Sequence, residues 1–163
     1  MKGRTTVATA IVKGKKKAHV REGLLSVVTG SLEFSSRGNA DTIRLTDEVR
    51  EALRQSGLQD GTLTVFAPGA TGAVTTIEYE PGVIKDLQEV LDAVVPPGHE
   101  WQHNINNGDG NGHSHVRAGL LGPSLTVPFV DGRLTLGRWQ EIVFCDFDAI
   151  PRERSLIVQV MGV

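Results

Sequence analysis

The chain contains 163 residues, of which 39% are hydrophobic and 22% charged, a composition typical of a soluble globular protein. Charged residues, Gly or Pro interrupt every apolar run. No run therefore reaches the ~20 residues of a membrane-spanning helix, and no membrane partner is expected. The single cysteine, Cys145, excludes an internal disulfide and a metal site made only of cysteines, and it favours a reducing, cytoplasmic location.

Basic side chains are concentrated at the start of the chain, where positions 1–28 contain seven Lys or Arg and one Glu. The rest of the chain, positions 29–163, contains ten basic and eighteen acidic side chains. We interpret residues 1–28 as a poorly ordered basic extension and residues 29–163 as a single domain. A nucleic-acid-binding arm is the alternative for the extension. The acidic domain offers no basic face, so nucleic acid is not the partner we expect.

The first half of the domain predicts a hairpin, a helix and two further strands. Alternating apolar and polar residues at Leu32–Phe34 and Thr42–Leu45 predict the two strands of the hairpin. The segment 46–57 predicts a helix, because it begins with a threonine N-cap and two acids and ends with glycine. Residues Thr62–Ala67 and Ala73–Glu78 then have the composition of strands.

The second half predicts helices first and strands afterwards. Apolar residues at helical spacing predict a helix over 83–94, which Pro96 ends. A polar loop over 99–112 and a short helix over His113–Leu121 follow. The predicted strands after that helix are Ser124–Val130, Arg133–Leu136, Trp139–Phe147 and Ser155–Met161. This order predicts an α+β fold with a largely antiparallel sheet or sandwich and two main helices.

Four of the five histidines, His99, His103, His113 and His115, lie close together in the sequence. Imidazole is the most common protein ligand for zinc, and a catalytic zinc needs three protein ligands. His113 and His115 share one face if the segment is extended, but on a helix they point roughly 200° apart. The sequence leaves two interpretations open, namely a metal site and four surface histidines in a polar loop.

Two further segments contain polar groups that could form a site. The run Asn106–Gly112 is rich in Asn and Gly, and such a loop can direct backbone amides towards an anion or form an exposed turn. Asp146 and Asp148 alternate at the end of a predicted strand, shortly before Arg152. These acids are candidates for a site, and a solvated strand end is the alternative.

Several motifs occur in the order found in a known family. The chain resembles the YjbQ-type family, called secondary thiamine-phosphate synthases, over about residues 30–162. The resemblance rests on the motifs Thr46–Arg50, Val65–Glu78, His103-Asn104, Asn111–His115, Leu121–Pro128, Gly137–Gln140, Phe147-Asp148 and Val158–Gly162.

The resemblance implies a YjbQ-like α+β domain that assembles as a homotrimer and has a histidine site for a divalent metal, zinc or magnesium. His103 and His115 match histidines of the family pattern, and Glu78 matches its acidic position. His113 falls where relatives often have another polar residue, and we expect His113 or Glu78 to be the third metal ligand. Many members have a His-Thr-Thr run where this chain has Gly69-Ala70-Thr71.

The activity attached to the family joins hydroxymethylpyrimidine diphosphate to thiazole phosphate, with release of pyrophosphate. A metal-assisted transferase acting on a small phosphorylated metabolite is therefore the expected function. The alternative is an oligomeric metal- or metabolite-binding protein, or a hydrolase with a histidine–metal centre. The expected catalytic residues are Glu78, Asp146 and Asp148, and the expected phosphate-binding residues are Asn111, Arg117, Arg138 and Arg152.

Overall fold

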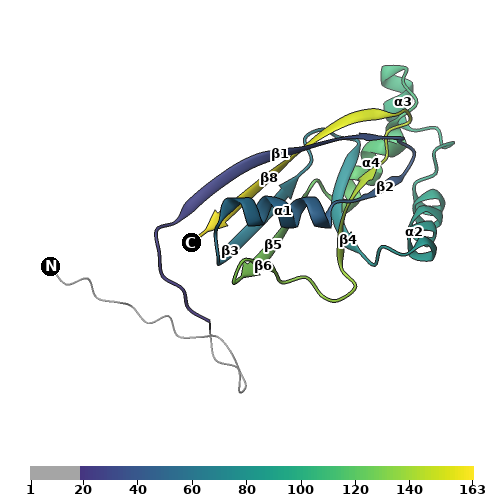
Figure 1. Cartoon of the computed structure of the whole chain (residues 1–163). Helices are drawn as coiled ribbons and strands as arrows, with labels where there is room; N and C mark the ends of the chain where they lie inside the picture. The colour runs from purple at the N-terminus through teal and green to yellow at the C-terminus, as the bar shows by residue number, and fades with distance from the viewer. Residues whose placement is uncertain (1–18) are drawn as a thin grey trace.

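A computed structural model describes residues 19–163, so residues 1–18 of the expected extension lie outside the described residues. Groups of strands and groups of helices follow one another along the described chain (Figure 1). In chain order the elements are β1 (Ser26–Ser36), β2 (Asp41–Arg44), α1 (Thr46–Ser56), β3 (Gly61–Phe66), β4 (Gly72–Ile77), α2 (Pro81–Val94), α3 (Gln102–Asn107), α4 (Gly112–Leu121), β5 (Ser124–Val130), β6 (Arg133–Leu134), β7 (Glu141–Asp146) and β8 (Arg152–Gly162).

The strands form two antiparallel sheets within residues 19–163. The larger sheet has the strand order β1-β8-β3-β5-β6, and the smaller has the order β2-β7-β4. β1 pairs with β8 along its whole length, from Ser26 opposite Gly162 to Ser36 opposite Arg152. The predicted α+β fold with a largely antiparallel sheet is confirmed. No helix in this part of the chain is long and apolar enough to cross a membrane.

Three local predictions were wrong. The predicted hairpin does not form, because β1 pairs with β8 in the larger sheet and β2 pairs with β7 in the smaller one. The expected polar loop contains helix α3, which ends where Gly108 adopts a left-handed conformation with φ of 71°. The last strand of the smaller sheet begins at Glu141 rather than at Trp139. The residues before it form a turn in which the Gly137 N–H donates to the Gln140 side chain at 2.7 Å.

The main core lies between the larger sheet, α1 and one face of the smaller sheet. Val49 and Leu53 of α1 are fully buried in it, together with apolar residues of β3, β5, β7 and β8. Thr46 was expected to cap α1, but its hydroxyl accepts a hydrogen bond from the Ile142 N–H of β7 at 2.8 Å. The start of α1 is therefore joined directly to the smaller sheet.

A second core covers the other face of the smaller sheet. Leu91 of α2 and Ala118 of α4 pack there against Val143 and Cys145 of β7. Burial raises the pKa of the Cys145 thiol to about 11, which keeps it protonated and poorly nucleophilic at neutral pH. The smaller sheet therefore has α2 and α4 on one side and the main core on the other.

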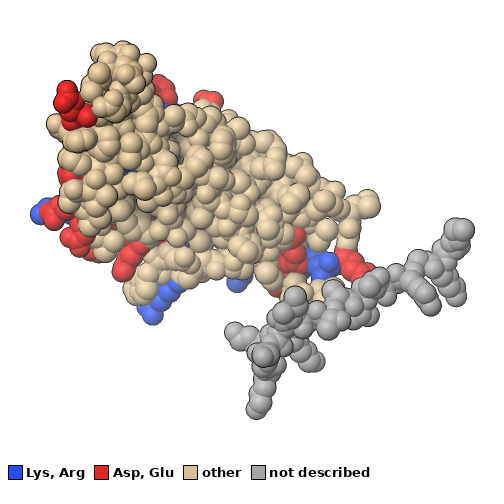
Figure 2. Space-filling model, turned by 180° about the vertical axis from the view of Figure 1, so that it is seen from behind, with Lys and Arg blue, Asp and Glu red and all other residues tan. Residues whose placement is uncertain are grey.

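The outer face of the larger sheet is exposed and uncharged over a wide area. Along β8 the buried Leu156, Val158 and Val160 alternate with the exposed Ile157, Gln159 and Met161. Seen from behind, the molecule has a broad face with acidic and basic side chains mostly at its edges (Figure 2). The other outward residues of its central part are Val27, Thr29, Ser31, Thr62, Thr64, Phe66, Ser124, Thr126, Pro128 and Val130, and the charged Glu33, Glu153 and Arg133 lie at its ends.

Two buried acids and their arginine partners join β7, β8 and the end of β1. Asp146 is completely buried and accepts hydrogen bonds from the Arg154 guanidinium, one of them at 2.6 Å, and from the Ser36 hydroxyl. Asp148 is 4% exposed and pairs with Arg152 at 2.9 Å. Burial alone would raise the pKa of Asp148, but the hydrogen bond and charge of Arg152 hold it below its usual range. We refer to these five residues as the buried acid network.

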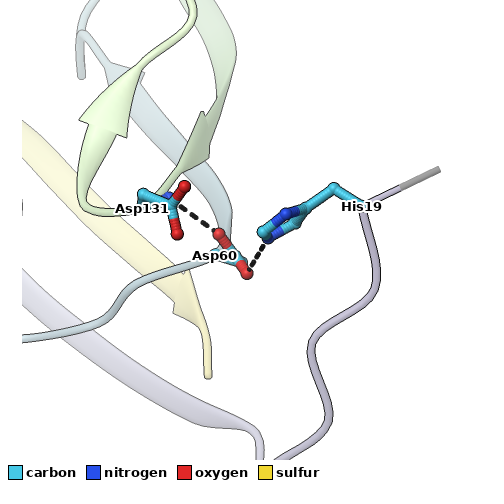
Figure 3. A group of neighbouring side chains, drawn as sticks. All are labelled: His19, Asp60 and Asp131. Carbon is cyan, nitrogen blue, oxygen red and sulfur yellow. Dashed lines mark hydrogen bonds and ion pairs between the residues drawn. The ribbon is translucent and has the colours of Figure 1, made fainter. Parts of the chain in front are cut away.

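Residues 19–25 precede β1 and are held to the end of the larger sheet by polar contacts. His19 pairs with Asp60 at 2.7 Å (Figure 3). Arg21 donates to both Asp60 and Asp131. The expected boundary between residues 28 and 29 was misplaced, because β1 already begins at Ser26. The backbone pairing with β8, rather than an apolar pattern in the sequence, extends the strand in this direction.

We predict that the segment before β1 contributes little to stability, whereas residues 26–28 contribute measurably. Deleting residues 2–25 removes exposed ion pairs, which are weak, and should leave the melting temperature almost unchanged. Deleting residues 2–28 also removes the first part of the pairing between β1 and β8. We expect a loss of about 2 kcal/mol, or roughly 4–8 °C. Calorimetry of both deletions tests this, and equal melting temperatures would contradict it.

We predict that Asp148→Asn destabilises the fold at neutral pH, because it removes a buried negative charge that pairs with Arg152 and faces Arg154. Arg152 is partly exposed and Arg154 keeps Asp146 as a partner, so the expected loss in the free energy of unfolding is about 1–2 kcal/mol. Since the pKa of Asp148 is lower in the folded state, its contribution is complete above pH ~4 and disappears as the pH falls further.

Denaturant unfolding of the wild type and the variant at several pH values tests this prediction. Asp47→Asn is the matched control, because Asp47 is an exposed acid that also pairs with arginine. If the difference in the free energy of unfolding between wild type and Asp148→Asn stays constant down to pH ~2, the assigned ion pair is contradicted.

Candidate functional site

Helices α3 and α4 bring His103 and His115 together. The centroids of the two imidazole rings lie 4.5 Å apart, with an angle of 63° between the ring planes. Since zinc–nitrogen bonds are ~2.0–2.1 Å long, rings at this separation are within reach of one metal ion. The structure therefore places side by side the two histidines that match the family pattern.

Gly112 allows the two helices to approach closely enough for this pairing. Its N–H donates to the Asn104 side-chain oxygen at 2.8 Å, which links the start of α4 to α3. A Cβ atom at position 112 would lie 2.6 Å from the Trp101 Cβ and 2.8 Å from that same oxygen. A larger residue would therefore push α3 away from α4 and separate the histidines.

Each of the two histidines has one ring nitrogen fixed by a neighbour. His115 Nδ1 lies 2.9 Å from the Ala70 carbonyl oxygen, which can only accept, so Nδ1 bears the proton and Nε2 has the free lone pair. The Asn107 side-chain nitrogen lies 3.0 Å from His103 Nδ1 and donates to it, which places the ring proton on Nε2. A metal at His103 Nε2 requires the Asn107 amide to be turned by 180°, so that its oxygen accepts from Nδ1–H.

His103 Nε2 is buried and has no hydrogen-bond partner among the described residues. An Asp109 carboxylate oxygen lies 3.1 Å away, but not in an orientation that makes a hydrogen bond. Two ligands of a tetrahedral zinc ion are separated by ~3.3 Å, a similar distance. An unpaired buried polar atom of this kind calls for an ion or a water molecule as its partner.

The two histidines open into a cavity of about 420 Å³. His99, Glu100 and Trp101 line it as well, and the His99 ring lies 4.7 Å from the Trp101 ring. His99 was predicted only as a member of the histidine cluster, and Glu100 and Trp101 were not predicted as part of the site. The position of Trp101 depends on its packing beside α4.

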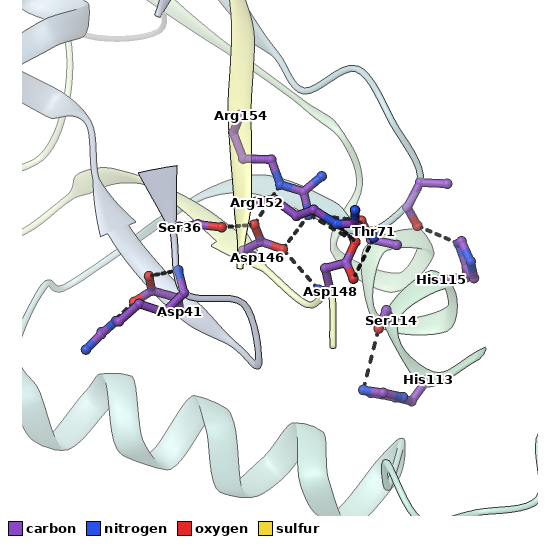
Figure 4. Close-up of polar contacts among 12 residues, drawn as sticks. Ser36, Asp41, Thr71, His113, Ser114, His115, Asp146, Asp148, Arg152 and Arg154 are labelled. Carbon is purple, nitrogen blue, oxygen red and sulfur yellow. Dashed lines mark hydrogen bonds and ion pairs between the residues drawn. The ribbon is translucent and has the colours of Figure 1, made fainter. Parts of the chain in front are cut away.

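His113 does not join the pair. It lies two residues before His115 on α4, and the two side chains leave the helix on different sides (Figure 4). His113 is 5% exposed, with Nε2 3.5 Å from the Ser114 hydroxyl. Burial first, and then the nearby Arg117, lower the pKa of His113. Its side chain is neutral and enclosed rather than directed into the cavity.

The expected catalytic acids occupy two different places. Asp146 and Asp148 belong to the buried acid network, which lies beneath Thr71 and not in the cavity (Figure 4). Glu78 is exposed just beyond the end of β4. In the pairing of β4 with β7, Gly72 opposes Asp146 and Ile77 opposes Glu141, so Glu78 lies at the end remote from the buried acids.

The expected phosphate-binding residues do not form one site in this chain. Arg117 is 1% exposed and donates to the Val95 carbonyl and to Asp92. Arg152 is paired with Asp148 in the buried acid network. Arg138 stacks on Trp139, 4.8 Å from the ring centroid, in the loop before β7. Asn111 precedes α4, and its side-chain oxygen is buried without a hydrogen-bond partner in the described structure.

One other group of side chains has the spacing of a metal site. His19, Asp60 and Asp131 have ligand atoms within 4.8 Å of one another, and no other such trio occurs in residues 19–163. Arg21 donates to both carboxylates and thus already offsets part of their charge. This group fastens the start of the described chain to the sheet, and the pair His103–His115 is the stronger candidate for a ligand.

Comparison with known proteins agrees with the fold. The family model described as "UPF0047 protein YjbQ-like" matches residues 30–163. A UPF0047 protein of Methanothermobacter thermautotrophicus is 36% identical over 85% of this chain and 94% of its own length. The structure of a YbjQ-like protein of unknown function from Sulfolobus solfataricus superposes with a TM-score of 0.81 and 27% identity, over 85% of this chain and 99% of that one.

A hypothetical protein from Aeropyrum pernix is also similar, with a TM-score of 0.74 and 33% identity over 82% of this chain and 99% of its own. None of these descriptions includes an activity, and the Sulfolobus protein is described as of unknown function. The prediction of a thiamine-phosphate synthase was therefore wrong as an inference from the family. The match over residues 30–163 and the 36% identity establish that the chain belongs to the UPF0047 YjbQ-like family.

Proposed function

We propose that this protein binds a divalent transition metal ion through His103 and His115. The observation that supports this most strongly is the buried, unpaired Nε2 of His103 beside a second imidazole whose own Nε2 is free. Imidazole nitrogen favours zinc and its neighbours in the transition series over magnesium. Zinc is accordingly the metal that we favour of the two expected from the sequence.

The surroundings of the two histidines fit a metal site in two respects. Hydrogen bonds at the second ring nitrogen, here with Ala70 and Asn107, fix the orientation of metal-binding histidines in many proteins. Asp109 and Glu100 supply oxygen ligands nearby, the first beside His103 and the second on the wall of the cavity. A bound metal would act as a Lewis acid towards a small molecule in the cavity.

We predict that His103→Ala and His115→Ala each weaken binding of Co²⁺, a coloured substitute for zinc, by at least tenfold. Because protons compete for the imidazole lone pair, wild-type binding should also weaken towards acidic pH. Titration followed by visible absorption measures both effects. Glu89→Ala is the control, since it removes an exposed side chain of α2 that lies neither in the cavity nor in the group of His19, Asp60 and Asp131. Wild-type affinity in both site variants would refute the proposal.

The family resemblance also leads us to propose that the chain assembles as a homotrimer. The uncharged outer face of the larger sheet supports self-association, because the centre of a protein interface is depleted of charged side chains. The centre of this face has no charged group to be desolvated, and Glu33, Glu153 and Arg133 lie at its ends. The proposed number of three subunits rests on the family resemblance, and the outer face of the larger sheet does not determine it.

We predict a mass in solution of about three times the 17.5 kDa of the chain. Ile157→Lys places a charge on the outer face and should shift the mass towards that of the monomer. Val90→Lys places the same charge on an exposed site of α2 and serves as the control. Light scattering after gel filtration measures all three proteins. A wild type with the mass of a single chain at micromolar concentration would rule out the assembly.

A further inference from the structure

We propose that Thr71 and Asp148 are positioning residues that set the orientation and protonation of His115. This inference rests on the proposed function, because it names residues that orient one ligand of the proposed metal site. The structural link runs from the buried acid network, through the loop between β3 and β4, to the imidazole of His115 (Figure 4).

The first contact in this link is made by the backbone. The Ala70 carbonyl oxygen lies 2.9 Å from His115 Nδ1 and keeps the proton on that nitrogen. Ala70 itself is exposed, as are Pro68 and Gly69 before it. The Ala70 side chain therefore does not explain why its carbonyl group faces the histidine. The residues on either side constrain the loop, because Gly69 has a φ of 112° and Thr71 is buried.

Thr71 holds the loop by its backbone and by its side chain. Its carbonyl oxygen accepts from the Phe147 N–H at 2.8 Å. Its hydroxyl donates to an Asp148 oxygen at 3.2 Å and accepts from the Arg154 guanidinium at 3.0 Å. Thr71 is 7% exposed, so these bonds are shielded from water. They fix the peptide group between Ala70 and Thr71, and with it the direction of the Ala70 carbonyl.

Asp148 is in turn immobilised by the network below it. Its N–H donates to Asp146 at 3.0 Å, and its carboxylate pairs with Arg152 and faces Arg154. Asp146 is itself enclosed and held by Arg154 and Ser36. The acids thus act on the site indirectly, as a rigid base for the loop, although they touch neither the cavity nor its histidines.

Thr71→Val tests the proposal, because valine has the shape of threonine and lacks its hydroxyl. Thr71→Ser restores the hydroxyl, and Thr64→Val removes a hydroxyl that bonds Thr126 on the far face of the larger sheet. Two quantities are measured for each protein. They are the tautomer of His115 in metal-free protein, from nitrogen NMR of the imidazole, and the affinity for Co²⁺.

We expect His115 to be protonated at Nδ1 in the wild type and in the Thr71→Ser and Thr64→Val variants. In Thr71→Val we expect a mixture of tautomers and a roughly 10- to 100-fold loss of Co²⁺ affinity, the usual effect of losing a group that orients a metal ligand. An unchanged tautomer and affinity in Thr71→Val would overturn the proposal.

The two readouts separate this inference from the proposed function. If the wild type binds no Co²⁺, the metal site fails, but the tautomer of the metal-free protein still decides whether Thr71 orients His115. If Thr71→Val does not fold, the wild type alone provides the test. A His115 that is protonated at Nε2 there would contradict the contact with Ala70 on which the inference is built.

Discussion

The ion pair between Asp146 and Arg154 is the interaction on which much of this structure depends. A carboxylate with no exposed surface is stable only when its charge and its lone pairs are satisfied, because desolvation is otherwise very costly. Arg154 and Ser36 provide those partners from two different strands. The pair therefore fixes where β1 ends and β8 begins, and it supports the turn after β7 that contains Asp148.

The same network shows why acids that look catalytic in a sequence can have another role. Asp146 and Asp148 alternate at a strand end, and this pattern fits both a site and a structural ion pair. The deciding facts are the burial of both acids and the position of Arg154, which precedes the apolar part of the last strand. Local spacing does not contain this information, because the pairing joins residues on different strands.

Most of the fold could be predicted from local patterns. Helix α1 followed from its acidic first turn and its final glycine, and α2 from its apolar spacing and the prolines after it. The alternation of exposed and buried residues identified β8. Helix α3 could not be predicted, since its Asn-rich sequence has low helix propensity and it forms against α4 through Asn104 and Gly112.

The candidate site was predictable only in part. The cluster of histidines identified His103 and His115, and the helical arrangement of α4 explains why His113 is directed elsewhere. Trp101 and Asp109 could not be found in this way, because their relation to the histidines depends on how α3 packs. Glu78 and Arg138 were grouped with the site on the basis of resemblance, but β4 and its partner strand place them elsewhere.

The contact that orients His115 has a consequence for how this family can be compared. A carbonyl oxygen is present in every residue type, so position 70 can change freely among relatives while the hydrogen bond is retained. An alignment of side chains would score that position as variable and overlook it. Divergent members could therefore share one geometry at this histidine without sharing the residue that provides it, and the signature to compare is the path of the loop backbone.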